Sequence, residues 1–165
     1  MTERRNSSVT DSPANDNGPE LVMTRVFDAP RALVFKAWTD PQHVQQWWSP
    51  HGFTNPVCEL DARPGGAIRI HMRGPDGTVY RMTGEYREIV EPERIVFISA
   101  ALDGEGKPMF EVLTTVTLVE NAGRTTLTMR AQIVKTTPMA AQYIAGMEVG
   151  WTQSLERFAK HLATM

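Results

Sequence analysis

The sequence predicts an α+β protein with a curved antiparallel sheet of about six to seven strands around one long C-terminal helix, and two short helices after the first strand. Proline-marked helix starts occur early and late in the chain. Between them lies a series of apolar runs separated by turn residues. Because strands and helices come in blocks instead of alternating, we expect the sheet to be antiparallel.

The first elements are a strand over residues 21–27 and the two short helices. Pro30 and Pro41 each follow a polar or capping residue, and proline is favoured in the first helical turn, where its missing N–H would have no partner anyway. An apolar stripe ending at Trp38 marks the first helix. Pro50 ends the second, because proline cannot continue a helix.

Hairpin turns divide the middle of the chain into strands. Gly, Pro, Asn and Asp gather between runs of β-branched or alternating apolar residues. These turns lie at residues 63–66, 74–77, 91–93, 103–106 and 121–123. They predict a meander of about six strands after the helix pair.

The C-terminal helix is expected to start at Thr137-Pro138 and to run nearly to the end. Its apolar residues recur every three or four positions, which gives one sustained apolar face. They are Ile144, Met147, Trp151, Leu155, Phe158 and Leu162. Such a face must be buried, and a curved sheet around the helix buries it while leaving space for a cavity.

Residues 1–19 differ in composition from the rest of the chain. They are rich in Ser, Asn, Thr, Asp and Pro and contain almost no large apolar residues. A segment of this kind cannot bury enough apolar surface to offset the entropy lost on ordering. We therefore predict a disordered lead at residues 1–19 and one domain at residues 20–165.

Composition limits the classes of function. The formal net charge is −2, so no basic field attracts nucleic acid. Cys58 is the single cysteine, which indicates a small hydrophobe in a reducing compartment. No segment approaches the length of a membrane span, and the first residues lack the apolar run of a signal peptide. We expect a cytoplasmic protein without membrane insertion.

No strong catalytic or metal-binding motif is present in the sequence. The histidines are scattered without the spacing of metal ligands, at His43, His51, His71 and His161. Gly65-Gly66 lies in a hairpin turn instead of ahead of a helix, and no Gly-x-Ser-x-Gly elbow occurs. The sequence predicts no catalytic residues, no metal and no cofactor.

Glu59 and Asp61 fall on one face of a predicted strand. Such a pair would support acid/base chemistry if it pointed into a cavity. The alternative, which we favour, is that the pair lies on an outer face, where the carboxylates are solvated by water or pair with Arg63 or Arg69. Exposed strand faces commonly carry charge.

Alternation along the strands assigns side chains to the two faces of the sheet. Ile68, Ile70 and Met72 share one face of their strand, whereas the intervening Arg69, His71 and Arg73 share the other. The apolar face either fills a core or lines a cavity. The chain has three tyrosines, Tyr80, Tyr86 and Tyr143. They either orient a polar group of a ligand or pack their rings in the protein with the hydroxyls in water.

Several short motifs together resemble the START-like (SRPBCC) superfamily, and within it the group similar to the C-terminal domain of the activator of the heat-shock-protein-90 ATPase. The motifs are Arg25-Val-Phe-Asp-Ala-Pro30, Ala37-Trp-Thr-Asp-Pro41, Trp47-Trp48 with Gly52-Phe53, Asp61-Ala-Arg-Pro-Gly-Gly66, Glu91-Pro-Glu-Arg94 and Gly150-Trp151. The resemblance covers the chain from about residue 21 to the end.

This resemblance implies a helix-grip fold, in which a curved antiparallel sheet grips the C-terminal helix and a deep apolar cavity lies between them. Because the superfamily includes carriers, receptors and cyclases, the fold alone does not select a function. We expect a non-enzymatic binder of a small hydrophobic molecule, such as a lipid, polyketide or aromatic metabolite. The expected lining comprises Trp38, Trp48, Phe53, Ile70, Met72, Tyr80, Met82, Phe97, Met129, Tyr143, Met147 and Trp151.

Two alternatives are kept open. A cyclase- or hydrolase-like enzyme would use the same cavity, and it requires an inward polar group such as His71, Glu59 or Arg81. A chaperone ATPase co-factor acting in the stress response follows from the family name alone.

Trp47 and Trp48 are consecutive on a helix, so their side chains project about 100° apart. We predict that Trp47 anchors the helix to the body of the protein. Trp48, together with Phe53, is expected to border the entrance of the cavity.

Overall fold

The computed structural model describes residues 6–10, 20–134, 138 and 140–165, without the side chains of residues 6–10, Ala140, Ala141 and Tyr143. Along the chain lie strands β1 (Asn6–Thr10) and β2 (Glu20–Phe27), helices α1 (Arg31–Thr39) and α2 (Pro41–Trp47), strands β3 (Thr54–Leu60), β4 (Ala67–Arg73), β5 (Val79–Val90), β6 (Arg94–Leu102), β7 (Pro108–Asn121) and β8 (Arg124–Ile133), and helix α3 (Ala140–Leu162).

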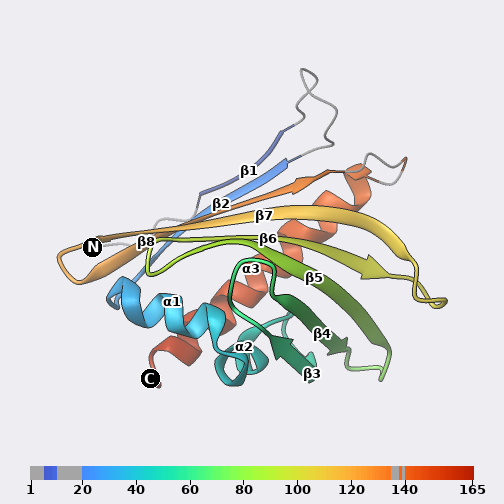
Figure 1. Ribbon diagram of the computed structural model, residues 1–165, viewed down its shortest axis with the longest axis horizontal. Helices are drawn as coiled ribbons and strands as arrows, with labels where there is room; N and C mark the ends of the chain where they lie inside the picture. Colours follow the sequence, from blue (N-terminus) through green and yellow to red (C-terminus); the bar gives the residue numbers. More distant parts are fainter. Residues whose placement is uncertain (1–5, 11–19, 135–137, 139) are drawn as a thin grey trace.

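All strands belong to one antiparallel sheet of eight strands in the order β1-β2-β8-β7-β6-β5-β4-β3. The strands from β3 to β8 form the predicted meander, and β2 closes back beside β8. Figure 1 shows the sheet arching over α3, with α1 and α2 near the C-terminal end of that helix. The α+β class, the curved antiparallel sheet and the C-terminal helix are therefore confirmed.

Strand β1 departs from the prediction of a disordered lead over residues 1–19. Residues 6–10 pair antiparallel with β2, with Asn6 opposite Thr24 and Thr10 opposite Glu20. An edge strand offers unpaired backbone groups to any neighbouring segment, so pairing here needs no apolar side chains. The remainder of the lead lies outside the described residues.

Local capping explains how α2 begins and ends. The Asp40 carboxylate accepts a hydrogen bond from the Gln42 N–H at 2.9 Å, and Pro41 occupies the first turn. The Trp48 N–H closes the last turn on the Val44 carbonyl, and Ser49 then adopts a positive φ of 86°. The predicted start of the long helix falls partly outside the described residues at Thr137, and α3 begins at Ala140.

The core lies between the concave face of the sheet and α3. The buried residues of α3 follow the predicted apolar stripe, with Ile144, Leu155, Phe158 and Leu162 all buried. The Phe27 ring of β2 meets the Phe158 ring edge to face, with centroids 5.0 Å apart. Among the described residues, no helix has the length and apolar character needed to cross a membrane.

Candidate functional site: an apolar cavity between sheet and helix

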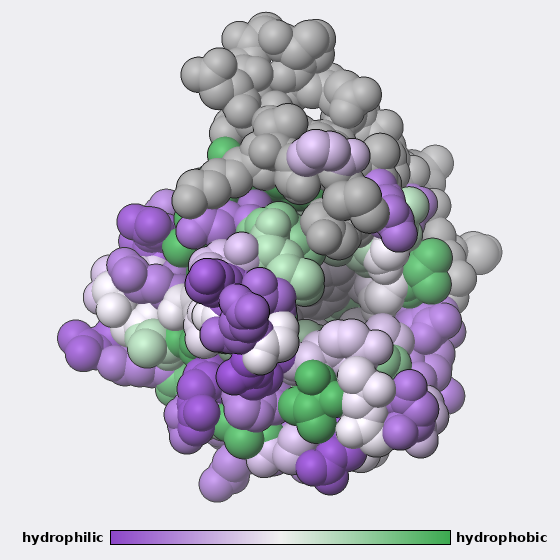
Figure 2. Space-filling view, turned by 90° about the vertical axis from the view of Figure 1, so that its right-hand side faces the viewer, coloured by the Kyte–Doolittle hydropathy of each residue, from purple (hydrophilic) through white to green (hydrophobic). Residues whose placement is uncertain are grey.

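A cavity of about 200 Å³ lies between strands β4 to β7, helix α3 and the segment that follows α2. Figure 2 shows a hollow at the end of the molecule that carries the β4–β5 and β6–β7 turns. The lining comprises Trp48, Ser49, Pro50, Met72, Met82, Phe97, Ser99, Ala101, Phe110, Val112, Thr114, Met147, Gly150, Trp151 and Ser154.

The described lining contains no charged side chain, and its polar side-chain groups are four hydroxyls and the indole N–H groups of Trp48 and Trp151. Ser49 donates to Asn55 Oδ1 at 2.7 Å, and Ser154 donates to the Trp47 carbonyl at 3.1 Å. These two hydroxyls are therefore engaged with the protein itself. Ser99 and Thr114 are the other two, from neighbouring strands β6 and β7. A surface of this kind suits an uncharged and mainly apolar ligand.

The wall formed by residues 48–50 is held by Arg157 of α3. The Arg157 guanidinium donates to the carbonyls of Trp48 at 3.0 Å, Ser49 at 2.8 Å and Pro50 at 3.0 Å. From the other side, Asn55 Nδ2 donates to the Trp48 carbonyl at 2.7 Å. Burial lowers the pKa of Arg157, but a guanidinium remains charged at neutral pH.

Aromatic rings pack side by side behind this wall. Trp151 of α3 stacks on Trp38 of α1, with centroids 5.7 Å apart and planes 12° apart, and its edge meets Trp48 at 5.0 Å. Trp47 is fully buried and donates from Nε1 to the Ala37 carbonyl at 2.9 Å. Trp48 is also buried, so both members of the tryptophan pair pack inside the protein.

A second, smaller cavity of about 10 Å³ shares Trp48, Met82 and Phe97 with the larger one. Its remaining lining comes from α1, α2 and strands β3 to β6: Trp38, Val44, Leu60, Ile68, Ile70, Tyr86 and Ile95. Burial is the main cause that raises the pKa of the Tyr86 phenol, so this hydroxyl stays protonated.

The structure places the residues predicted to line the cavity in three groups. Those on the larger cavity are Trp48, Met72, Met82, Phe97, Met147 and Trp151. Trp38 and Ile70 border the smaller one. Phe53, Tyr80 and Met129 line neither, and the side chain of Tyr143 lies outside the described residues.

Phe53 and Tyr80 lie near each other, with ring centroids 6.2 Å apart, and Tyr80 is exposed because it stands near the start of β5. Met129 is fully buried, in the part of the sheet formed by β2, β8 and β7. Sharing a face with the cavity residues therefore does not place a side chain in the cavity.

Five lining residues on β6 and β7 were missed by the sequence reasoning. They follow strict alternation along each strand, in register with the predicted Phe97: Ser99, Ala101, Phe110, Val112 and Thr114. The alternation was the available signal. Ser99, Ala101 and Thr114 are small or polar and do not resemble an apolar lining when they are read one at a time, whereas Phe110 and Val112 are apolar and were identifiable by alternation with Phe97.

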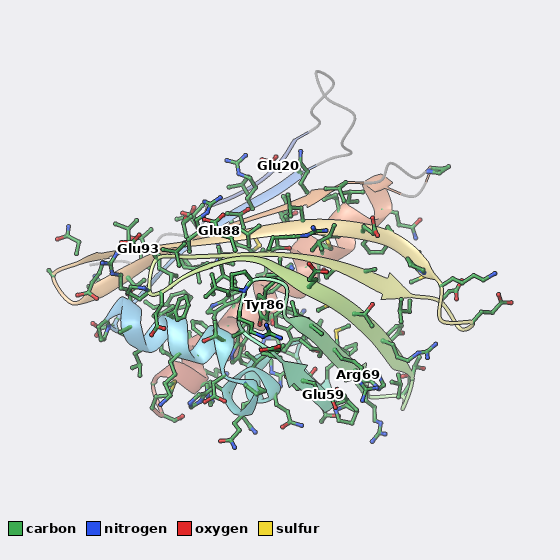
Figure 3. All side chains as sticks on the ribbon, viewed as in Figure 1. Glu20, Glu59, Arg69, Tyr86, Glu88 and Glu93 are labelled. Atoms are coloured by element: carbon green, nitrogen blue, oxygen red, sulfur yellow. The ribbon has the colours of Figure 1, made fainter. Side chains whose placement is uncertain are left out.

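The carboxylates of Glu59 on β3 and of Asp61 just after it both pair with arginines. Glu59 accepts from Arg69 Nε at 2.9 Å, and the two side chains lie together at the β3–β4 edge in Figure 3. This hydrogen bond holds the pKa of Glu59 below its usual value. Asp61 pairs with Arg63 at 2.8 Å. Neither carboxylate lines a cavity, which matches the favoured outer-face interpretation.

The other ionisable candidates also lie outside the cavity lining. His71 and Arg81 border neither cavity, and the Arg81 guanidinium donates to the Asp103 carbonyl at 3.1 Å. Burial raises the pKa of the Cys58 thiol to about 11, so the thiolate is scarce at neutral pH. The described residues contain no group of three or more His, Cys, Asp or Glu arranged to hold a metal ion.

Comparison with known proteins identifies a matching family and solved structures with the same fold. The family described as Activator of Hsp90 ATPase homolog 1-like protein matches residues 28–163. A crystal structure of a protein from Chromobacterium violaceum is 30% identical, with a TM-score of 0.76, over 87% of this chain and 96% of that chain. A search of the curated proteins found no match.

Two further solved structures share the fold. A solution structure of a protein from Arthrobacter aurescens has a TM-score of 0.81 at 25% identity, over 96% of this chain and 92% of that one. A crystal structure of a protein named AHSA1 from Silicibacter pomeroyi has a TM-score of 0.77 at 24% identity, over 88% of this chain and 98% of that one. The chain thus belongs to the Activator of Hsp90 ATPase homolog 1-like family of the START-like (SRPBCC) superfamily.

Proposed function

We propose that residues 20–165 form a ligand-binding domain that encloses one small, uncharged hydrophobic molecule between the sheet and α3 without catalysing a reaction on it. One observation carries this proposal: a cavity of about 200 Å³ whose described lining contains no charged side chain. Removing apolar surface of a ligand from water is favourable, and few polar groups would be left without partners.

The size of the cavity limits the ligand. An engineered apolar cavity of about 150 Å³ holds benzene, whereas sites for drug-sized molecules span roughly 300–1,000 Å³. A molecule of one or two fused rings therefore fits better than a complete lipid. The adaptable side chains of Met72, Met82 and Met147 suit such a ring system. Among the predicted ligand classes, an aromatic metabolite or a small polyketide is favoured.

The described lining of the larger cavity offers the enzymatic alternative no ionisable side chain. Glu59, His71 and Arg81 were the residues required to face inward, and none of them lines either cavity. Proton transfer needs a side chain within hydrogen-bond reach of the reacting atom.

The family description supplies a further alternative, stimulation of the Hsp90 ATPase. Measuring that ATPase rate with and without this protein distinguishes a co-factor from a binder. The cytoplasmic location remains a prediction from the sequence.

Isothermal titration with a panel of one- and two-ring compounds, including indane, naphthalene and 1-indanone, tests the proposal. We expect at least one to bind below millimolar Kd and to raise Tm, because a ligand of the folded state stabilises that state. Ala101→Phe fills the cavity and should abolish binding, since Ala101 lines it.

Ala100→Phe is the matched control. Ala100 neighbours Ala101 on β6 and points to the opposite face of the sheet, so this variant should bind as the wild type does. The proposal is wrong if no compound of the panel binds the wild-type protein. Equal binding by the two variants would place the ligand elsewhere.

A further inference from the structure

The indole N–H of Trp38 is a buried donor that no described residue accepts from. Trp38 is 4% exposed, and its Nε1 atom has no hydrogen-bond partner among the residues that the structure describes. The Nε1 of Trp47, equally enclosed, donates to the Ala37 carbonyl at 2.9 Å. Buried donors are nearly always paired, because an unpaired one has lost its water without replacement. The exception at Trp38 therefore calls for an acceptor from outside the described chain.

Trp38 lies behind the lining of the larger cavity. It borders the smaller cavity, which shares Trp48, Met82 and Phe97 with the larger cavity. Its ring is stacked on Trp151, which lines the larger cavity, with centroids 5.7 Å apart. Trp38 does not line the larger cavity, so a ring system seated against Trp151 and Trp48 would reach it through a short substituent that passes the shared residues into the smaller space.

The smaller cavity measures about 10 Å³, close to the space that one water-sized atom group occupies. A water molecule there would need partners for two hydrogens and two lone pairs, yet the side chains around it are apolar except for the indole N–H groups of Trp38 and Trp48 and the Tyr86 hydroxyl. A carbonyl oxygen carries no hydrogen and is satisfied by one donor. A carboxylate is disfavoured, because the described linings of both cavities contain no cation to pair with it.

We infer that the ligand is a neutral aromatic carbonyl compound, whose ring system occupies the larger cavity and whose carbonyl oxygen accepts a hydrogen bond from Trp38 Nε1 in the smaller one. This inference rests on the proposed function, since it specifies the class of molecule bound in the same cavity. It assigns Trp38 a role in selecting the ligand beyond its packing in the core.

The pair indane and 1-indanone tests the inference, because the two molecules share a ring system and differ by one carbonyl group. Water solvates the ketone better than the hydrocarbon, so a preference for the ketone requires a donor in the protein. We expect wild-type protein to bind 1-indanone about fivefold more tightly than indane, in line with one net hydrogen bond. Isothermal titration measures both affinities.

Two variants locate the donor. Trp38→Phe keeps an aromatic ring but removes the N–H, so the preference for the ketone should disappear while indane binds within twofold of wild type. Trp47→Phe is the matched control, because it also removes a buried indole N–H but Trp47 borders neither cavity. This control should keep the preference.

The outcomes separate this inference from the proposed function. Binding of neither probe to wild type overturns both. Binding of both with no preference for 1-indanone, or a preference that survives in Trp38→Phe, overturns the inference alone and leaves the cavity as a binding site.

Indole signals in a ¹⁵N-labelled NMR spectrum provide a test that does not depend on the folding of Trp38→Phe. The Trp38 N–H signal of the wild-type protein, assigned through its contacts to neighbouring protons, should move downfield with 1-indanone and much less with indane. A Trp38 signal that responds equally to both probes contradicts the inference.

Discussion

Arg157 on α3 donates to the carbonyl of Ser49 at 2.8 Å, and Ser49 is a non-glycine residue with a positive φ of 86°. A positive φ is unfavourable for a residue with a side chain and persists only where its surroundings impose it. The same guanidinium also binds the carbonyls of Trp48, Pro50 and Gln46. One arginine of the long helix thus fixes the segment that forms a wall of the cavity.

Arg157→Lys should destabilise the protein and loosen this wall. A lysine ammonium cannot reproduce the planar fork that reaches several carbonyls, and partly buried acceptors would lose charged partners. We expect a loss of about 2 kcal/mol in the free energy of unfolding, measured by urea denaturation. Arg63→Lys is the control, because Arg63 pairs with Asp61 on the surface and both are well exposed. Equal stability of the two variants would contradict the role of Arg157.

Alanine substitutions at two glycines of α3 distinguish an effect on folding stability from an effect on ligand binding. Gly146 faces open space, and an added Cβ meets no atom within 4 Å, whereas a Cβ at Gly150 would lie 3.6 Å from Pro50 Cγ in ordinary contact. Replacing a helical glycine with alanine stabilises by roughly 0.5–1 kcal/mol. Both Gly146→Ala and Gly150→Ala should therefore raise Tm.

Ligand affinity should distinguish these two variants. Gly150 lines the cavity and Gly146 does not, so Gly150→Ala narrows the site while Gly146→Ala leaves it unchanged. Titration with the tightest-binding compound of the panel measures the difference. A loss of affinity in Gly146→Ala alone would argue against the position assigned to the cavity.

The contact between His43 of α2 and His161 of α3 predicts a dependence of stability on pH. His43 Nδ1 and His161 Nε2 are 2.9 Å apart, and burial, with a smaller contribution from His43, lowers the pKa of His161 from its usual 6.5. As pH falls below 6.5, the unfolded chain takes up a proton at this residue before the folded protein does. The free energy of unfolding should therefore decrease with falling pH until the folded-state pKa is passed.

Urea denaturation between pH 7.5 and 5.5 measures this effect above the range in which most carboxylates titrate. His161→Gln should flatten the slope of stability against pH. His51→Gln is the control. His51 follows α2, and its Nε2 lies 3.7 Å from Glu156 Oε2 of α3 in an exposed pair. This variant should keep the slope that His161 contributes. An unchanged slope in His161→Gln would show that another group is responsible.

Much of the fold follows from residues that act on their near neighbours. Asp40-Pro41 sets the start of α2 through a cap and a fixed φ, and a positive φ at Gly65, Gly77 and Gly123 shapes the hairpin turns. Alternation along β4 buries Ile68 and Ile70 and exposes Arg69. Propensity, capping and periodicity are local properties, so the sequence by itself determined the elements from β2 onward, their order and the inner face of the sheet, whereas β1 forms through pairing with β2.

The tertiary structure decided which inward residues meet a ligand-sized space. Met129 and Phe97 both point inward, yet one is enclosed in the core and the other lines both cavities, because the gap between sheet and helix depends on how the whole sheet curves. Only the packed structure shows that Trp47 Nε1 has an acceptor while Trp38 Nε1 has none within the described chain. Cavities and unpaired donors arise from contacts between distant segments, which no local pattern in the sequence encodes.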